Sequence, residues 1–453
     1  MIIRRENSIF LCVLFTTFLA FAGTLSAAPS VLQVAVTTSD STATPKALRI
    51  EGQGFGSKAD SAPILVDYVS HAFEYGTRNE TQSLLSDMEN LPRADENPGA
   101  VWASWTTDVY YSTSHSRRHS GSKASYFLKG GNAWFGLPTA YGGATGWDTP
   151  IDNPQLYVSW WYKNRYKSTW LWRITPVNMQ GEFLKDERIE IEGVGTGTYA
   201  GTGEQGMLAM AFDQRYGGAP SLVGKKIIGT QSGAVTYFPE QFIGSGDSGY
   251  LFAGSKLARI WDDPKGSAGI RSSVAVHDFY VLPSREGYEI AKVYDSLELP
   301  PNQWVHLEYL LDTAKGVVKM YADGRLRGEA KFDPTAIYNG KYSPTLSLIG
   351  TNGRLPSVQV SEISEIYIDK SWQRVVIGNA PRYSEVTRSE VQRPIQWADT
   401  EIDVALNLGA LDSSTGAYLY VFDRDNNVNE NGVPLCDVVD CGSPPAPVSL
   451  DVQ

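Results

Sequence analysis

Two acidic side chains two positions apart are the clearest candidates for acid–base chemistry. Segment 187–194 alternates charged and aliphatic residues, so a strand there would place Glu190 and Glu192 on one face. Two carboxylates at this spacing suit the cleavage of a glycosidic bond, where one serves as the acid and the other as base or nucleophile. The same alternation is typical of the solvent face of a strand, and we favour that interpretation.

A second chemistry would use a histidine and a tyrosine. Segment 273–282 reads as a strand that carries His277 and Tyr280, and residues 115–119 form a loop with two histidines and two arginines. Removal of a proton next to a uronate carboxylate needs groups of these types, to neutralise the carboxylate and to act as base. Neither set completes a known catalytic motif, so the sequence leaves open whether the protein is an enzyme.

Aromatic and basic residues recur along a predicted hairpin formed by residues 156–163 and 169–174. Alternation would place Leu156, Val158 and Trp160 on the core face, and the opposite face would present Trp161, Lys163, Arg165 and Arg173. Sugar rings stack on aromatic faces, and uronate or sulfate groups suit the arginine fork. The alternative is a solvated face whose charges discourage edge pairing.

The first 27 residues predict a signal peptide. Arg4 and Arg5 precede an apolar run from Ile9 to Ala22, and small residues follow at 26–28. Removing residues 1–27 leaves 37 basic and 49 acidic residues, a net charge of −12. That balance argues against nucleic acid as a partner. We expect a secreted, periplasmic or cell-surface protein without membrane insertion after signal removal.

Two short features near the C-terminus concern cross-links and metals. Cys436 and Cys441 are the two cysteines beyond the signal, and an oxidising compartment predicts a disulfide between them. Residues 423–432 are rich in oxygen ligands, but Val428 stands where an EF-hand needs glycine. A structural turn is the favoured interpretation. A structural Ca²⁺ stays open, and the sequence implies no other cofactor.

The composition is typical of an all-β protein. The chain has 43 Gly, 24 Tyr, 16 Phe and 12 Trp, and period-two alternation dominates it. The clearest hairpin runs from Trp304 to Gly324, with a turn at Lys315-Gly316. This hairpin and segment 119–127 resemble motifs of the concanavalin A-like lectin/glucanase sandwiches. The resemblance implies a jelly-roll β-sandwich over residues 65–382, a fold that hosts lectins, lyases and hydrolases alike.

The same resemblance bears on catalysis. Residues 190–195, Glu-Ile-Glu-Gly-Val-Gly, are similar to the glucanase motif E-(I/L)-D-x-x-E, but Gly195 replaces the third glutamate. This departure argues against a retaining glucanase of that type. Residues 388–393 are superficially similar to a strand of alginate lyases, but they lie beyond the predicted sandwich.

Segments at opposite ends of the chain resemble the two halves of a TIG-type immunoglobulin-like domain. Residues 47–57 read as a strand that enters a glycine-rich corner, and residues 394–405 and 417–423 read as two further strands. The resemblance implies a small immunoglobulin-like β-sandwich formed by residues 30–64 and 383–435, with the larger sandwich inserted between them. Residues 436–453 would form a disulfide-stapled tail.

These features favour a polysaccharide-binding protein, lectin-like or adhesive, at the cell surface or secreted. The ligand would be an extracellular polysaccharide held across Trp161 and its basic neighbours. One alternative is a polysaccharide lyase or glycoside hydrolase that acts on an acidic polysaccharide. A second is a structural surface protein.

Overall fold

The structure is a computed structural model of the 453-residue chain. It describes residues 28–37, 47–67, 109–112, 117, 125–129, 132–136, 154–165, 171–202, 206–213, 222–240, 256–261, 270–275, 278–283, 291–294, 299–336, 344–352, 360–411 and 414–437. Within these residues the protein is all β, with 28 strands and three short 3-10 turns. No helix in these ranges has the length and apolar character to cross a bilayer. The predicted signal peptide lies outside them.

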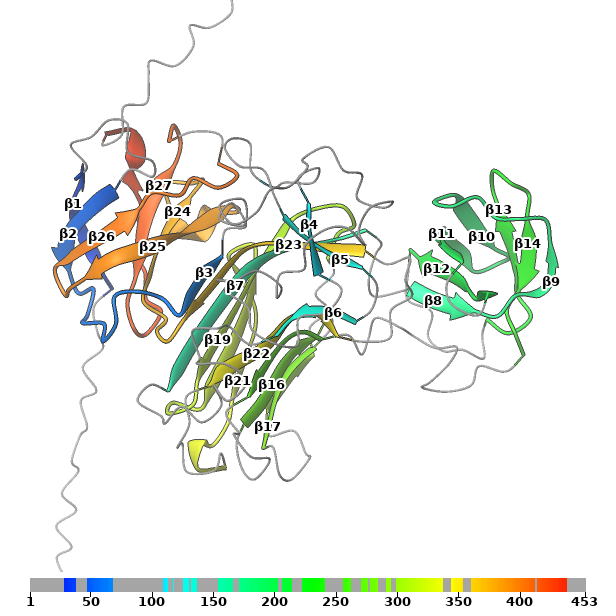
Figure 1. The fold of residues 1–453 in the computed structure, drawn as a ribbon, viewed down its shortest axis with the longest axis horizontal. Helices are drawn as coiled ribbons and strands as arrows, with labels where there is room; N and C mark the ends of the chain where they lie inside the picture. Colours follow the sequence, from blue (N-terminus) through cyan, green and yellow to red (C-terminus); the bar gives the residue numbers. More distant parts are fainter. Residues whose placement is uncertain are drawn as a thin grey trace, which may run out of the picture.

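The two ends of the described chain meet in one sheet, which we call the terminal sheet (Figure 1). Its strands, in spatial order, are β1 (Ser30–Val36), β2 (Ala47–Gln53), β26 (Glu401–Ala405), β25 (Ser389–Trp397), β24 (Arg374–Gly378), β27 (Tyr418–Phe422) and β28 (Val433–Pro434). β2 is antiparallel to β26, with Leu48 opposite Val404 and Ile50 opposite Ile402. All four side chains are buried. Residues far apart in sequence therefore share one core.

The terminal sheet differs from the sequence prediction in two details. Residues 394–405 were expected as one strand, but a turn at 398–400 divides them between β25 and β26, and Ala398 N donates to Glu401 O. β24 belongs to this sheet although it precedes residue 383, the predicted start of the second half. The domain boundaries of the sequence analysis stay predictions.

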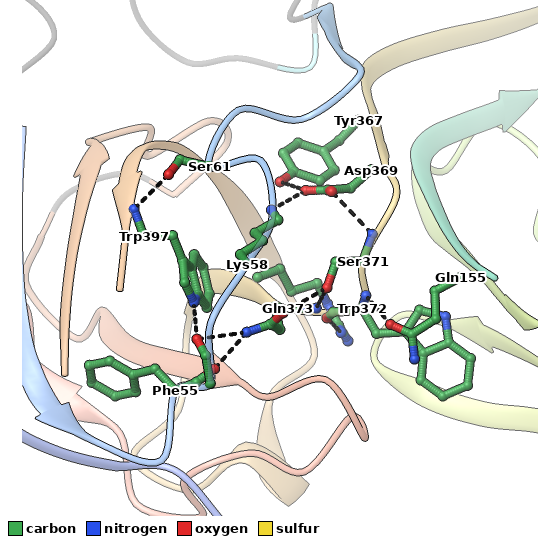
Figure 2. A network of polar contacts seen from close by, with 12 residues as sticks. Phe55, Lys58, Ser61, Gln155, Tyr367, Asp369, Ser371, Trp372, Gln373 and Trp397 are labelled. Carbon is green, nitrogen blue, oxygen red and sulfur yellow. Dashed lines mark hydrogen bonds and ion pairs between the residues drawn. The ribbon is translucent and has the colours of Figure 1, made fainter. Parts of the chain in front are cut away.

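Gly52 explains the corner that follows β2. A Cβ there would lie 2.1 Å from the Ser30 carbonyl oxygen and 2.4 Å from the ring of Phe55. The buried Phe55 ring thus packs directly against the backbone at Gly52. Figure 2 shows how the corner is held: Gln373 Nε2 donates to Phe55 O at 2.7 Å, and Trp397 Nε1 donates to Gly56 O at 2.9 Å.

Two further sheets form the central sandwich. The first contains β21 (Arg325–Lys331), β20 (Val317–Ala322), β19 (Val305–Asp312), β7 (Gln155–Asn164), β23 (Val360–Asp369), β5 (Ser125–Lys129) and β4 (Val109–Ser112), with β3 (Leu65–Asp67) paired to β23. The second contains β18 (Ala291–Tyr294), β17 (Asp278–Pro283), β16 (Ile270–Ala275), β15 (Lys256–Trp261), β22 (Thr345–Asn352) and β6 (Asn132–Phe135).

The central core joins side chains from both sheets. Trp160 and Tyr309 from the first sheet share one buried cluster with Leu257, Ile260 and Ile349 from the second. The predicted hairpin of residues 304–324 is confirmed as β19 and β20. The single strand predicted for 273–282 is wrong, because these residues divide between β16 and β17, which pair with Ser273 opposite Tyr280.

Residues 171–237 form a third unit, the side lobe, which the sequence analysis did not predict (Figure 1, right). It contains β8 (Leu171–Ile174), β12 (Leu208–Phe212), β11 (Gly195–Thr202), β10 (Arg188–Ile191), β13 (Lys226–Gly229), β14 (Val235–Tyr237) and β9 (Val177–Gln180). The predicted hairpin of 156–163 with 169–174 is therefore wrong. β7 pairs with β19 and β23, and β8 pairs with β12.

The central strands are buried on both faces. One face of β7 and β19 fills the sandwich core, and the other packs against the terminal sheet. Tyr157 and Leu310 on this second face share a cluster with Val376, Tyr420 and Phe422. We call this contact the seam. A strand covered on both sides loses its polar face, which is why every residue of β19 is buried.

Candidate functional site

Trp161 lies in the seam and not on an open face. Its side chain is 5% exposed and stacks on His306 of the neighbouring strand, with ring centroids 5.0 Å apart and planes 22° apart. The guanidinium of Arg117 lies 4.1 Å from the indole centroid. The prediction of an exposed stacking ring is wrong, because another part of the chain covers this face of the sheet.

Arg117 connects the seam to the terminal sheet. It donates two hydrogen bonds to Glu390 of β25, at 2.5 and 2.6 Å, and lies 3.8 Å from Glu365. Burial raises the pKa of Glu390, and the charge of Arg117 opposes this rise. Glu365 has a φ of 53° within an irregular stretch of β23 between Ser364 and Tyr367. The bulge places an additional carboxylate beside the guanidinium.

His306 and Glu308 extend the seam along β19. Burial lowers the pKa of His306 to about 4, so its imidazole is neutral at neutral pH. Glu308 accepts a hydrogen bond from the Tyr157 hydroxyl at 2.7 Å and lies 3.4 Å from Arg374 Nη2. Glu308 therefore binds side chains of both the sandwich and the terminal sheet, which indicates a structural contact between these two units.

The other predicted ligand-binding residues do not gather around Trp161. Lys163 pairs with Glu362 at 2.8 Å and lies over the Trp304 ring. Arg165 pairs with Asp186 of the side lobe at 2.6 Å. Arg173 is on β8 in a different sheet, and its side chain lies outside the described residues.

The weak catalytic candidates also lie in separate places. Glu190 is on β10 of the side lobe, and both Glu190 and Glu192 are exposed while Ile189 and Ile191 are buried. The predicted alternation is therefore confirmed. His277 and the side chain of Tyr280 lie outside the described residues. A catalytic role for any of these groups stays a prediction.

The oxygen-rich segment near the C-terminus is a hydrogen-bonded turn. Asp423 Oδ1 accepts hydrogen bonds from the backbone of Asp425 and Asn427, and Oδ2 accepts one from the Asn427 side chain. Its oxygens thus serve the turn geometry. Among the residues that the structure describes, no cluster of three His, Cys, Asp or Glu side chains could hold a metal. Cys441 lies outside these residues, so its pairing with Cys436 stays a prediction.

A further site with the features of a binding pocket lies beside the turn between β20 and β21. Asp323 and Gly324 form this turn with φ values of 49° and 70°. Asp323 exchanges hydrogen bonds with the backbone of His306, at 2.8 and 2.9 Å, which holds the turn against the start of β19. A Cβ on Gly324 would lie 3.4 Å from Val386 O, so the turn abuts the loop between β24 and β25.

A cavity of about 320 Å³ opens at this junction of sandwich and terminal sheet. Leu299, Val305 and Ala322 contribute apolar surface. The remaining lining residues are Pro300, Asp323, Arg325, Arg327 and Thr387. Arg325 and Arg327 both come from β21 and both line the cavity, and the pairing of β21 with β20 is irregular between Leu326 and Gly328. Both arginines are exposed.

Positive charge dominates the polar side of this pocket. Burial raises the pKa of Asp323, while the His306 backbone hydrogen bond and the charges of Arg325, Arg388 and Arg327 oppose the rise. The charges of three guanidinium groups therefore act on one carboxylate, and two of these arginines line the cavity. Such a site suits an anion, because guanidinium groups bind carboxylates and sulfates through paired hydrogen bonds. The other interpretation is an edge strand whose charges prevent pairing with another sheet.

Sequence reasoning missed this pocket. The Arg-Leu-Arg segment at 325–327 follows a predicted hairpin and was available as a signal. The wall at Thr387 comes from a loop more than fifty positions later, and no local pattern links the two.

No model of a protein family matches this chain, and no curated protein matches it. Among solved structures, the binding domain of Paraclostridial Mosquitocidal Protein 1 is 9% identical with a TM-score of 0.29, over 82% of this chain and 72% of that chain. The botulinum neurotoxin serotype C1 binding domain is 9% identical with a TM-score of 0.22, over 72% of this chain and 55% of that chain.

A catalytic domain of a GH131 beta-glucanase from Podospora anserina is 11% identical with a TM-score of 0.22, over 59% of this chain and 82% of that chain. The chain thus spans a little over half of the botulinum domain that it matches. Likenesses this distant do not indicate what the present chain binds.

Proposed function

We propose that this protein is an exported, glycan-binding protein that takes an acidic sugar residue in the pocket beside β21. The observation that carries the proposal is a cavity lined both by Arg325 and Arg327 and by apolar side chains. The predicted signal peptide supports export. The pairing of β2 with β26 supports the further proposal that a TIG-type domain, interrupted by the sandwich, forms a rigid base.

The pocket chemistry suits a charged sugar unit better than a long neutral chain. Small-molecule sites span about 300–1,000 Å³, so a cavity of about 320 Å³ is at the lower end of that range. It would take one residue or a chain terminus. The carbon face of the ring would contact Leu299 and Val305, and its carboxylate or sulfate would meet the two arginines.

Binding to immobilised polysaccharides tests this function. We expect retention on uronate-containing or sulfated polysaccharides, weaker retention on neutral ones, and loss of binding as salt increases. Arg325→Ala with Arg327→Ala should reduce affinity for the anionic polymer by tenfold or more, since each lost charged hydrogen bond is worth about 1.5–3 kcal/mol.

Arg382→Ala is the matched control, because Arg382 is an exposed arginine in the neighbouring loop that does not line the cavity and that pairs with Glu385 at 2.7 Å. This variant should bind like the unchanged protein. Equal affinity of the double variant and the unchanged protein would overturn the pocket assignment. New reducing ends or absorbance from an unsaturated product would replace the binding role with a hydrolase or a lyase.

A further inference from the structure

A lysine and an aspartate from distant parts of the chain meet in the interior between the terminal sheet and the sandwich (Figure 2). Lys58 follows the glycine corner after β2, and Asp369 ends β23. Lys58 Nζ lies 2.5 Å from Asp369 Oδ2, and the two side chains are only 3% and 2% exposed. The contact joins positions that are 311 residues apart.

The neighbours of this pair are arranged differently around the two carboxyl oxygens. The Tyr367 hydroxyl donates to Oδ2 at 2.7 Å, the same oxygen that contacts Lys58. The backbone N–H of Ser371 donates to Oδ1 at 3.2 Å. The ring of Trp397 has its centroid 5.2 Å from Lys58 Nζ. Oδ2 thus has the Tyr367 hydroxyl as a proton donor beside it, and Oδ1 has the backbone N–H of Ser371.

Burial makes the charged form of this pair costly. A buried ammonium and a buried carboxylate both lose their hydration, and this cost can exceed their mutual attraction. Transfer of one proton from nitrogen to oxygen gives an amine and a carboxylic acid, which removes both charges. Burial raises the pKa of Asp369, and Lys58, Tyr367 and Ser371 oppose that rise. An uncharged amine in contact with a carboxylic acid is the reactive pair for amide formation.

We propose that Lys58 and Asp369 form an intramolecular isopeptide bond. Lys58 first gives one proton to the carboxylate of Asp369. The neutral Nζ then attacks Cγ, so a C–N bond forms as the bond from Cγ to Oδ2 breaks. Oδ2 leaves as water with the first proton and with a second that passes from nitrogen through the Tyr367 hydroxyl. One proton stays on the amide nitrogen, and no oxidant or reductant is needed.

The side chains around the pair have separate roles in this step. Tyr367 is the general acid at the leaving oxygen. The Ser371 N–H stabilises the negative charge that develops on Oδ1. Close placement in the folded protein substitutes for an activated intermediate, because oriented groups at contact distance react far faster than free ones.

Mass spectrometry of the mature, full-length chain tests the inference. After reduction of disulfides and unfolding, we expect the protein to be lighter than its sequence mass by one water. Digestion should release a branched peptide in which the Lys58 segment is joined to the Asp369 segment. Lys58→Arg keeps the positive charge but cannot form the bond, so it should have its full sequence mass.

Further variants separate the chemistry from folding. Tyr367→Phe should fold and give a slowly changing mixture of joined and unjoined chains. Asp369→Asn should lose ammonia in place of water. Lys163→Arg, in the less buried pair with Glu362, should leave the mass loss unchanged. A folded, unchanged protein with its full mass and no branched peptide would overturn the proposal and leave an ordinary ion pair. Glycan binding is measured separately and does not depend on this outcome.

Discussion

A guanidinium, an imidazole and an indole pack together at Trp161, and carboxylates on two strands surround the guanidinium. Alternation along β7 correctly separated Trp160 from Trp161, because successive side chains of a strand point to opposite faces. It could not tell whether the second face meets water or another sheet. Glu390, which binds the Arg117 guanidinium over the Trp161 ring, is more than two hundred positions away, so no local pattern could indicate the burial of Trp161.

At this scale the ion pair of Arg117 and Glu390 gives a sharp prediction. Both side chains are 2% exposed, so Arg117→Met leaves a carboxylate buried without its partner. We expect a loss of about 3–5 kcal/mol in the free energy of unfolding, as measured with urea. Arg117→Met combined with Glu390→Leu should recover part of that loss, because it removes one of the two carboxylates beside the guanidinium and leaves Glu365.

An exposed pair provides the control for that measurement. Lys315 and Asp425 are each about half exposed, so Lys315→Ala should change stability by no more than about 1 kcal/mol. Equal effects of Arg117→Met and Lys315→Ala would contradict the importance of the buried pair.

Strands with a strong local signal were predicted well. The hairpin of β19 and β20 was found because its aromatic and aliphatic residues alternate on either side of a glycine turn at Lys315-Gly316. The side lobe was missed because the alternation of apolar residues in β8 is also what a hairpin partner of β7 would show. Alternation gives the face of a residue but not the partner of its strand, and β8 pairs with β12.

The pairing of β2 with β26 predicts the response to a single truncation. Leu48 is fully buried between the chain ends, so Leu48→Ala should lower the free energy of unfolding by about 2–5 kcal/mol. Leu32→Ala on β1, where the side chain is 69% exposed, should change it by less than about 0.5 kcal/mol. Chemical denaturation of both variants measures the difference. Similar values for the two variants would contradict the shared core.

At the scale of the whole molecule, three units with their own apolar clusters are built from one chain. The all-β class followed from composition and alternation, and the sandwich was implied by the resemblance to concanavalin A-like proteins. The covered face and the arginine pocket did not follow, because each depends on how the units contact one another. A pocket lined by Arg325 and Thr387 exists only after the sandwich and terminal sheet are in place.

Division of one core between the chain ends predicts fragment complementation. A fragment of residues 374–437 lacks Leu48, Ile50 and Phe55, which belong to the same cluster as Val375 and Ile402. We expect this fragment to be unfolded alone and to gain β structure when a peptide of residues 28–64 is added. Circular dichroism and amide exchange measure both states. A fragment that folds cooperatively without the peptide would show that β1 and β2 are dispensable.

The pairing of Arg49 with Asp403 also limits when the terminal sheet can fold during synthesis. Arg49 donates two hydrogen bonds to the Asp403 carboxylate, and the two residues are 354 positions apart in the chain. At about 5–20 residues per second, the ribosome needs on the order of 20–70 s to make the stretch between them. During that interval the buried face of β2 has no neighbour at β26. The chain therefore has to be shielded until its last strands are made, and a polypeptide cut short before β26 would display that apolar strand to chaperones and proteases.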